Sequence, residues 1–280
     1  MAQIGKTNRL KVLRKVSIGI YLDGETLGDL LVPNRYVPEG TKEGDELEVF
    51  IYLDSEDRLI ATTEKPYAQV GEFDLLKAAA VTKVGAFLDW GLPKDLLVPF
   101  SEQQQKMVVG NQYLVYVYLD DNTKRIVASA KIDKFIDNLP PDYTIGQEVQ
   151  LIIAARTDIG YKAIINGIHS GMLYHNQVFS SLTIGQKMKG FIQKVRDDEK
   201  IDLLLEKPGY EKIDDLSQVV MDQLNAKGGF IALTDKSDPD EIARLLGMSK
   251  KNFKKAIGGL YKKRMIDILE NGIKLNLSGL

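Results

Sequence analysis

The chain has 280 residues, 44 % of them hydrophobic and 27 % charged, a composition typical of an ordinary globular protein. Its 37 basic and 39 acidic residues give a formal net charge of -2, which excludes a protein that coats nucleic acid by uniform positive charge. Cysteine is absent, and this excludes disulfides, thiolate catalysis, zinc ribbons and iron–sulfur clusters.

The first 15 residues contain five basic residues and no apolar run, so they do not resemble a signal peptide. No stretch of the sequence approaches the roughly 18 apolar residues that cross a membrane. We therefore expect a cytoplasmic protein. His169 and His175 are the only histidines, which argues against a zinc site built mainly from imidazole. We expect no metal site and no cofactor.

Three internal repeats organise the first two thirds of the chain. The sequence DLLVP occurs at residues 29–33 and again at 95–99, and a weaker third copy lies at 171–175. A glycine precedes the last residue of each copy by 14, 14 and 15 residues. The shared order and spacing indicate duplication. The glycines are Gly19, Gly85 and Gly160, the last residues of the copies are Pro33, Pro99 and His175, and the tripeptide Glu-Lys-Pro recurs at 64–66 and 206–208.

Each repeat is followed by segments that alternate between apolar and polar residues, as in 47–53 and 113–119. This period of two predicts short strands separated by turns, such as 54–57 and 197–199. Five short strands in about 70 residues suit a small closed barrel, because closure removes exposed edges. We expect barrels at 1–65, 66–140 and 141–209, with Pro140-Pro141 breaking the chain before the third.

After Gly209 the apolar period becomes helical, beginning with Leu216 to Leu224. Residues 238–241 have the N-cap, proline and acids of a helix start, and Ser249 can cap the helix that follows. Two strands at 265–269 and 273–275 flank Asn271-Gly272, a hairpin signal. This order predicts a winged helix over 210–280. The expected apolar faces are Ile242, Ala243, Leu245 and Leu246 in one helix and Phe253, Ile257, Leu260 and Tyr261 in the next.

The last predicted helix and its exit contain seven basic residues and no acid. Basic side chains neutralise phosphates and release counterions, so this helix is a candidate nucleic-acid contact. A solvated helix face and a protein-docking surface are the alternatives. The seven residues are Lys250, Lys251, Lys254, Lys255, Lys262, Lys263 and Arg264.

Aromatic residues in the repeats suggest both base stacking and packing. Phe87 is the candidate stacking residue of the second barrel, with core packing as the alternative. Trp90 follows it and is expected to cover the barrel end rather than contact a ligand. Equivalent aromatic residues of the first two barrels face away from the apolar alternation, and we expect them to pack between neighbouring barrels. These are Phe50 and Tyr52 in the first barrel and Tyr116 and Tyr118 in the second.

The third repeat combines aromatic and basic residues, as single-strand binding requires. Tyr161, Tyr174 and His175 lie there with Lys162 and Arg156. Enzymatic interpretations find little support, because no P-loop, dinucleotide fingerprint or nucleophile elbow is present. The acids at 197–199 are interpreted as a hairpin turn rather than a cation site.

The second repeat resembles the S1-like RNA-binding domain, an OB-type five-stranded barrel that binds single-stranded RNA. Gly85, Ala86 and Phe87 match the glycine–aromatic strand of that family, and residues 124–129 match its last strand. The resemblance implies roles for Phe87 and for Asp121 with Arg125, which Asp54 and Arg58 match in the first repeat. The family's Leu-Val-His histidine is matched by His175, whereas Pro33 and Pro99 replace it elsewhere. In the third repeat, Arg196 replaces the acid and Lys200 follows it.

The whole chain resembles the bacterial conserved virulence factor B family, most specifically at 235–239, 248–250, 253–258 and 260–262. That resemblance implies three S1-like barrels and a winged helix in an RNA-binding regulator of gene expression, including virulence genes. It also implies that the third barrel and the winged helix bind the RNA. Residues 212–280 have 12 basic and 9 acidic residues, whereas residues 1–64 have 8 and 12.

We therefore expect a non-enzymatic protein that binds single-stranded RNA on one surface, formed by the third barrel and the basic helix. One alternative is a winged-helix regulator of transcription that reads duplex DNA. The lack of arginine between 249 and 263 argues against it, because arginine makes the commonest specific base contact. The other alternative is an adaptor for ribosomal or RNA-decay proteins.

Overall fold

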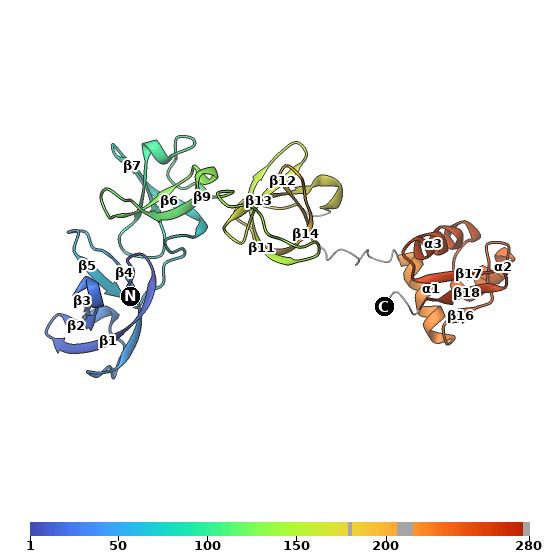
Figure 1. Ribbon diagram of the computed structural model, residues 1–280, viewed down its shortest axis with the longest axis horizontal. Helices are drawn as coiled ribbons and strands as arrows, with labels where there is room; N and C mark the ends of the chain where they lie inside the picture. Colours follow the sequence, from blue (N-terminus) through green and yellow to red (C-terminus); the bar gives the residue numbers. More distant parts are fainter. Residues whose placement is uncertain (179–180, 206–214, 277–280) are drawn as a thin grey trace. The chain divides into compact units, whose positions relative to one another are not determined.

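The computed structural model describes residues 1–178, 181–205 and 215–276 (Figure 1). The chain divides into two compact units, Met1–Pro208 and Gly209–Leu280. The first unit contains three closed barrels of five strands, as the sequence predicts. The tripeptide at 206–208 and the expected boundary between 209 and 210 lie outside the described residues.

All three barrels have the same strand order. The first strand of each pairs with the second and fourth, and the third pairs with the fifth in parallel. Barrel 1 consists of β1 (Thr7–Val16), β2 (Gly19–Asp23), β3 (Asp29–Pro33), β4 (Glu46–Leu53) and β5 (Leu59–Thr62). Barrel 2 consists of β6 (Phe73–Thr82), β7 (Gly85–Asp89), β8 (Leu96–Pro99), β9 (Gln112–Leu119) and β10 (Ile126–Ser129). Barrel 3 consists of β11 (Glu148–Arg156), β12 (Gly160–Ile165), β13 (His169–Tyr174), β14 (Lys187–Val195) and β15 (Ile201–Leu204).

Short 3-10 helices connect some of these strands. One follows the third strand of each barrel. The first strand of each barrel also has a register shift where it pairs with the second, and such a bulge bends the strand so that the barrel closes. The 3-10 helices are Glu25–Leu27, Asn34–Tyr36, Phe100–Glu102, Ile132–Lys134 and His175–Gln177.

The repeated glycine opens the second strand of every barrel, where it lies against the third strand. A Cβ on Gly19 would lie 2.0 Å from the carbonyl oxygen of Val32. The same addition at Gly85 would meet the Val98 oxygen at 2.3 Å, and at Gly160 the Leu173 oxygen at 2.0 Å. No side chain fits at these distances, so close approach of two backbones explains the glycine in all three repeats.

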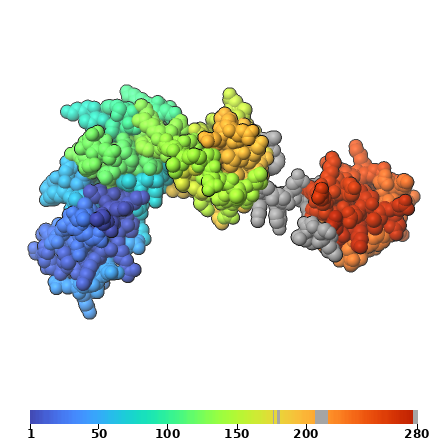
Figure 2. Space-filling model, in the orientation of Figure 1, coloured from blue at the N-terminus to red at the C-terminus, as the bar shows by residue number. Residues whose placement is uncertain are grey.

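Barrels 1 and 2 share one apolar cluster, as the outward aromatic residues predict. The atoms of the two barrels, blue for barrel 1 and cyan to green for barrel 2, adjoin in Figure 2. Phe50 and Tyr52 of barrel 1 are buried in it with Trp90 of barrel 2. Tyr67 donates its backbone N–H to the Trp90 carbonyl, and the Trp90 indole donates to the Lys94 carbonyl. Trp90 therefore fills the junction between two barrels.

A second cluster joins barrel 2 to barrel 3. Tyr116 stacks on Phe135 with ring centroids 4.2 Å apart, and Tyr118 lies 5.3 Å from the same ring. Phe135 belongs to the segment between the barrels, and the cluster includes the buried Ile164 of barrel 3. The expectation that the residue packs between barrels is confirmed for Tyr116, whereas Tyr118 packs against Phe135 of the connecting segment.

The described part of the second unit is a winged helix, with three α-helices and a three-stranded sheet. Asp238 caps α2 by accepting a hydrogen bond from the Asp240 N–H, and Ser249 caps α3 through the Asn252 N–H. Its core includes the buried side chains of Phe253 and Leu260 from α3. The elements are α1 (Asp215–Ala226), β16 (Phe230–Ile231), α2 (Pro239–Leu246), α3 (Lys250–Lys262), β17 (Ile266–Leu269) and β18 (Gly272–Leu275).

Several details of this unit differ from the sequence prediction. Tyr261 is 55 % exposed rather than part of the apolar stripe, and Ala243 is also exposed. Ala256 belongs to the core although the prediction left it out, because it lies on the same helix face as Phe253 and Leu260. The short β16 was not expected. Its backbone approaches Gly272, where a Cβ would lie 2.3 Å from the Ile231 oxygen, so this glycine serves the sheet.

Candidate nucleic-acid interface

A hollow in barrel 3 lies beside its second and third strands, β12 and β13. In barrels of the OB type, this face and the loops next to it bind oligonucleotides and oligosaccharides. Two adjoining pockets of about 510 and 610 Å³ share Ile159, Tyr174 and Asp202. The polar residues around them include Asp137, Asp158, Lys162, His175, Gln177, Gln193, Arg196, Asp198, Glu199 and Lys200.

Tyr174 of β13, Asp202 of β15 and Arg196, which follows β14, form a hydrogen-bonded network that lines this cleft. The Arg196 Nε donates to Asp202 Oδ2 at 2.9 Å, and a second guanidinium nitrogen lies 2.8 Å from Oδ1. The Tyr174 hydroxyl donates to the same carboxylate at 3.1 Å and accepts from Arg196. Hydrogen bonding to Asp202 and the charge of that carboxylate raise the pKa of Arg196. Arg196 is therefore held in one place, with its charge balanced.

His175 lies at the rim of the cleft, immediately after β13, and its side chain is exposed. Its Nε2 lies 3.2 Å from the Thr157 carbonyl oxygen. Because a carbonyl oxygen can only accept, the Nε2–H of His175 donates in this contact. Tyr161 meets the imidazole edge-on, with ring centroids 5.5 Å apart.

Tyr161 itself is only 6 % exposed and belongs to the core of barrel 3. Its ring is thus not accessible to a base, contrary to the stacking role suggested by the sequence. The burial follows from its place on β12, where it packs inside the barrel while Lys162, next in the chain, points outward. Tyr161 positions His175 instead.

The cations around the cleft are paired with acids. Lys162 Nζ lies 2.7 Å from Asp133 Oδ1, and Lys200 Nζ lies 2.8 Å from Asp198 Oδ2. The hydrogen bond from Lys200 lowers the pKa of Asp198. With Asp137, Glu199 and Asp202 also present, the cleft is not a basic channel, and its polar groups suit bases and sugars better than phosphates.

In barrel 2, the predicted pair of Asp121 and Arg125 does not form. Arg125 donates to Asp57 of barrel 1, whose carboxylate also lies 3.5 Å from Lys94 Nζ. The acid that matches Asp54 is Asp120, not Asp121, because the Asp120 N–H bonds the Arg125 carbonyl as the Asp54 N–H bonds that of Arg58. The turn between the fourth and fifth strands is one residue longer in barrel 2 than in barrel 1. The acid therefore precedes the arginine by five residues in barrel 2 and by four in barrel 1. Phe87 is half-buried on β7.

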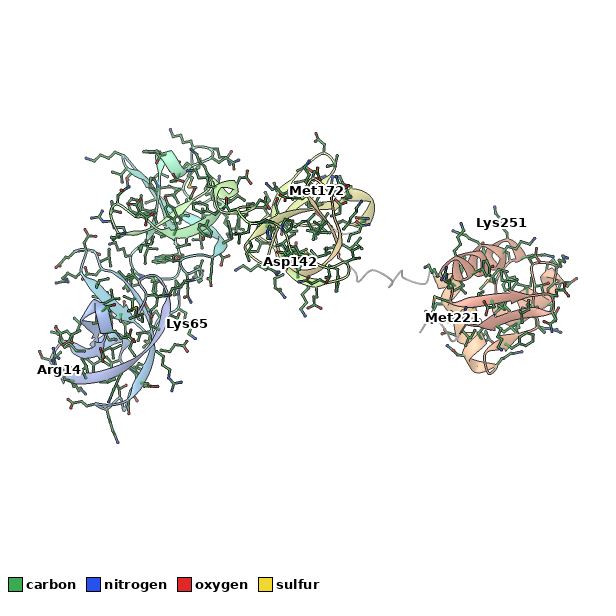
Figure 3. The ribbon with its side chains drawn as sticks, viewed as in Figure 1. Arg14, Lys65, Asp142, Met172, Met221 and Lys251 are labelled. Atoms are coloured by element: carbon green, nitrogen blue, oxygen red, sulfur yellow. The ribbon has the colours of Figure 1, made fainter. Side chains whose placement is uncertain are left out.

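In the winged helix, most of the predicted basic residues line the outer side of α3. Lys251, Lys255 and Lys262 are exposed, and Lys251 projects outward from the helix in Figure 3. Among the described residues, no carboxylate lies within 4.0 Å of these three ammonium groups. Lys250 donates to the Ser237 carbonyl at 2.8 Å, and Lys254 lies 3.6 Å from Asp235. Beyond the helix, Lys263 is half-buried and Arg264 is exposed.

The placement of these lysines opposes helix stability. Cations are unfavourable at the positive N-terminal end of a helix, yet Lys250 and Lys251 occupy the first turn of α3, which has no acid. The neighbouring α2 has the favourable arrangement, with Asp240 and Glu241 in its first turn. Lysines four residues apart also repel each other. An anionic partner would reverse each of these costs.

Sequence reasoning missed the acidic lining of the cleft and Gln177, whose side-chain oxygen is buried without a hydrogen-bond partner in the described structure. A signal for one acid was present, since Asp202 interrupts an apolar strand and its outward direction follows from the period of two. No group of three or more His, Asp or Glu side chains within 1–178, 181–205 and 215–276 is arranged to hold a metal. No helix in these ranges has the length and apolar character of a membrane span.

Two family models match the chain. The S1 domain matches residues 4–64, and the CvfB-like winged helix domain matches residues 218–275. Neither is a model of a catalytic domain.

Two relatives match over most of this chain and most of their own length. Conserved virulence factor B of Staphylococcus epidermidis is 25 % identical over 243 residues, which cover 84 % of this chain and 82 % of the relative. The protein of that name from Staphylococcus aureus strain N315 is 25 % identical, with 84 % and 81 % covered. A crystal structure of a multidomain protein with nucleic acid binding domains, from Streptococcus pneumoniae TIGR4, matches at a TM-score of 0.44 and 23 % identity, over 97 % of this chain and 98 % of that chain.

Proposed function

The chain belongs to the conserved virulence factor B family, and from this premise we propose that it is a non-enzymatic, cytoplasmic protein that binds single-stranded RNA. It acts as a post-transcriptional regulator of gene expression, which in a pathogen includes virulence genes. Barrel 3 and the winged helix make the RNA contacts. Barrels 1 and 2 contribute mainly a scaffold, because their outward aromatic residues are used between barrels.

The observation that carries this proposal is the basic face of α3. Lys251, Lys255 and Lys262 have no acidic partner in the described structure, and the first turn of the helix opposes its own dipole. A helix optimised only for stability has acids in its first turn, as α2 has. A polyanion compensates both the dipole and the repulsion between lysines.

Barrel 3 supplies a different kind of contact. Its cleft holds a rigid Arg196–Asp202–Tyr174 network and the exposed His175, next to carboxylates. Carboxylates repel phosphates but accept hydrogen bonds from base amino groups and ribose hydroxyls. We therefore assign phosphate contacts to α3 and base or sugar contacts to barrel 3.

The test is a titration of the full chain with a single-stranded RNA of about 12 nucleotides at low and moderate salt. The triple variant Lys251→Gln, Lys255→Gln, Lys262→Gln should bind more weakly and with a shallower salt dependence, by about 0.7 in log–log slope per lost phosphate contact. The matched control is Lys227→Gln with Lys236→Gln, which neutralises two exposed lysines of the same unit. Equal affinities for the triple variant and the wild type would contradict the proposal.

The same titration separates the alternatives. Tighter binding to duplex DNA than to single-stranded RNA would favour a regulator of transcription. If the protein bound neither, and its partners remained associated after nuclease treatment, the adaptor interpretation would replace ours.

A further inference from the structure

Tyr261 is a large aromatic side chain that the winged helix leaves in solvent. It is 55 % exposed at the last turn of α3, although its neighbour Leu260 is fully buried. Helical side chains tilt toward the N-terminus of their helix, so the surface next to Tyr261 belongs to the preceding turn. The residue three positions earlier, and thus beside it on the helix surface, is Gly258.

Gly258 has no structural reason to be a glycine. Apart from the neighbouring backbone of α3, a Cβ built on it would meet no heavy atom of the described residues within 4 Å, and its φ lies outside the left-handed region. Glycine is the poorest helix former after proline, so this position sacrifices helix stability without a gain in packing. Gly258 is half-buried, and the open space lies where its side chain would stand, one turn before Tyr261.

Cations surround this open space. Lys254 and Lys255 precede Gly258 by four and three residues, and Lys262 follows it by four. These are the separations at which helical side chains are neighbours on the surface. Lys255 and Lys262 are exposed and lack an acidic partner in the described part of the chain. An accessible aromatic face between ammonium groups is the arrangement that binds single strands, with a base on the ring and phosphates on the cations.

We propose that Tyr261 and Gly258 form a stacking site for one unpaired nucleobase, held by phosphate contacts to Lys255 and Lys262. Tyr261 supplies the π-face, and the missing side chain of Gly258 allows the base to approach the helix. The site accepts an unpaired base and not a base pair, because a duplex hides the faces of its bases by stacking. The inference rests on the proposed function, since it names which atoms of α3 distinguish single-stranded RNA from other polyanions.

Two substitutions in the full chain test the site, with a 12-nucleotide oligoadenylate as the probe. Tyr261→Leu keeps an apolar side chain but removes the ring, and it should weaken binding about tenfold. Tyr261→Phe should bind like the wild type. Gly258→Ala should raise the thermal stability of the winged helix and yet weaken binding several-fold, because stability and binding respond to the added methyl group in opposite directions.

Gly259→Ala is the matched control. It makes the same change one residue along the helix, where a Cβ would lie 3.9 Å from the Ser217 Oγ, an ordinary van der Waals contact. It should also stabilise the helix, but it should leave binding unchanged because position 259 does not lie beside Tyr261 on the helix surface. Equal effects of the two alanine variants on binding would overturn the role of Gly258.

A probe without bases separates this inference from the proposed function. The Tyr261→Leu variant should bind an abasic strand of the same length as tightly as the wild type does, whereas the triple lysine variant should bind it more weakly. Wild-type affinity of Tyr261→Leu for oligoadenylate, together with a loss in the lysine variant, would overturn the stacking site and leave the proposed function intact. If the wild type bound neither strand, the proposed function itself would fail.

Discussion

Trp90 of barrel 2 packs edge-on against Phe50 of barrel 1, with ring centroids 5.7 Å apart and an interplanar angle of 79°. The two side chains are 3 % and 1 % exposed, so the junction between these barrels is packed as tightly as a domain core. This geometry is favourable for an aromatic pair beyond the area that it buries. The two barrels are therefore expected to unfold as one cooperative block.

Phe50→Ala should lower the free energy of unfolding of this block by about 3–5 kcal/mol, because it opens a cavity at the junction. Trp90 is the only tryptophan in the chain, so its emission in a urea titration reports on this contact directly. Val84→Ala is the control, since Val84 is 52 % exposed and should change the midpoint little. An unchanged midpoint for Phe50→Ala would show that the junction contributes no stability.

Gly160→Ala should destabilise barrel 3 by roughly 1–3 kcal/mol, because the new methyl group would lie 2.0 Å from the Leu173 oxygen and would force β12 and β13 apart. Hydrogen exchange of the β12 and β13 amides, measured by mass spectrometry, locates the effect. Faster exchange confined to barrel 3 is expected, and wild-type protection there would refute the steric explanation for the repeated glycines.

Glu102 should make the stability of barrel 2 depend on pH. Its carboxylate accepts from the buried Ser129 hydroxyl at 2.6 Å and from Lys134 at 2.9 Å. Burial raises the pKa of Glu102, but the hydrogen bonds from Ser129 and Lys134 outweigh burial and lower it. A lowered folded-state pKa means that the ionised carboxylate stabilises the fold above the unfolded-state pKa, and that this stabilisation is lost as the pH falls through the folded-state pKa.

Glu102→Gln should therefore cost about 1–2 kcal/mol near neutral pH, and less below pH of about 4. The measurement is a set of urea titrations of both proteins across that range. A difference between Glu102→Gln and the wild type that stayed constant with pH would show that the charge of Glu102 has no part in the effect.

His175→Ala should weaken binding of single-stranded RNA about fivefold or more, because the exposed imidazole at the cleft rim is available to a base or ribose. Arg125→Gln serves as the comparison, since Asp57 already engages that guanidinium. We expect Arg125→Gln to change RNA affinity less than twofold, within ordinary surface effects. If Arg125→Gln weakened RNA binding more than His175→Ala, the binding face would lie on barrel 2 rather than on barrel 3.

Much of the fold was readable from local patterns. The helix caps at Asp238 and Ser249 form as predicted, because each depends only on residues within the same turn. The alternation in β4 and β9 likewise predicts strands whose outward aromatic residues need a partner. What local patterns predicted less well was the exact match between repeats, since the extra residue in the turn of barrel 2 moves the equivalent acid from Asp121 to Asp120.

Local sequence patterns predicted only part of the candidate site. The sequence identifies Arg196 and Tyr174 as chemically suitable, but the carboxylate that holds both comes from Asp202 on another strand. Tyr261 was expected in the core and is exposed, whereas Tyr161 was expected to be accessible to a base and is buried. Burial depends on what packs against a face, and that neighbour is distant in the sequence.

The sequence by itself determined three barrels, a winged helix and a helix rich in lysine, because turn chemistry, periodicity and charge are properties of neighbouring residues. The tertiary structure alone decided which of the charged and aromatic groups remain available. It pairs Arg125 with Asp57 across two barrels, and it leaves Lys251, Lys255 and Lys262 without an acid in the described chain. Availability depends on distances between elements far apart in sequence, and only folding sets those distances.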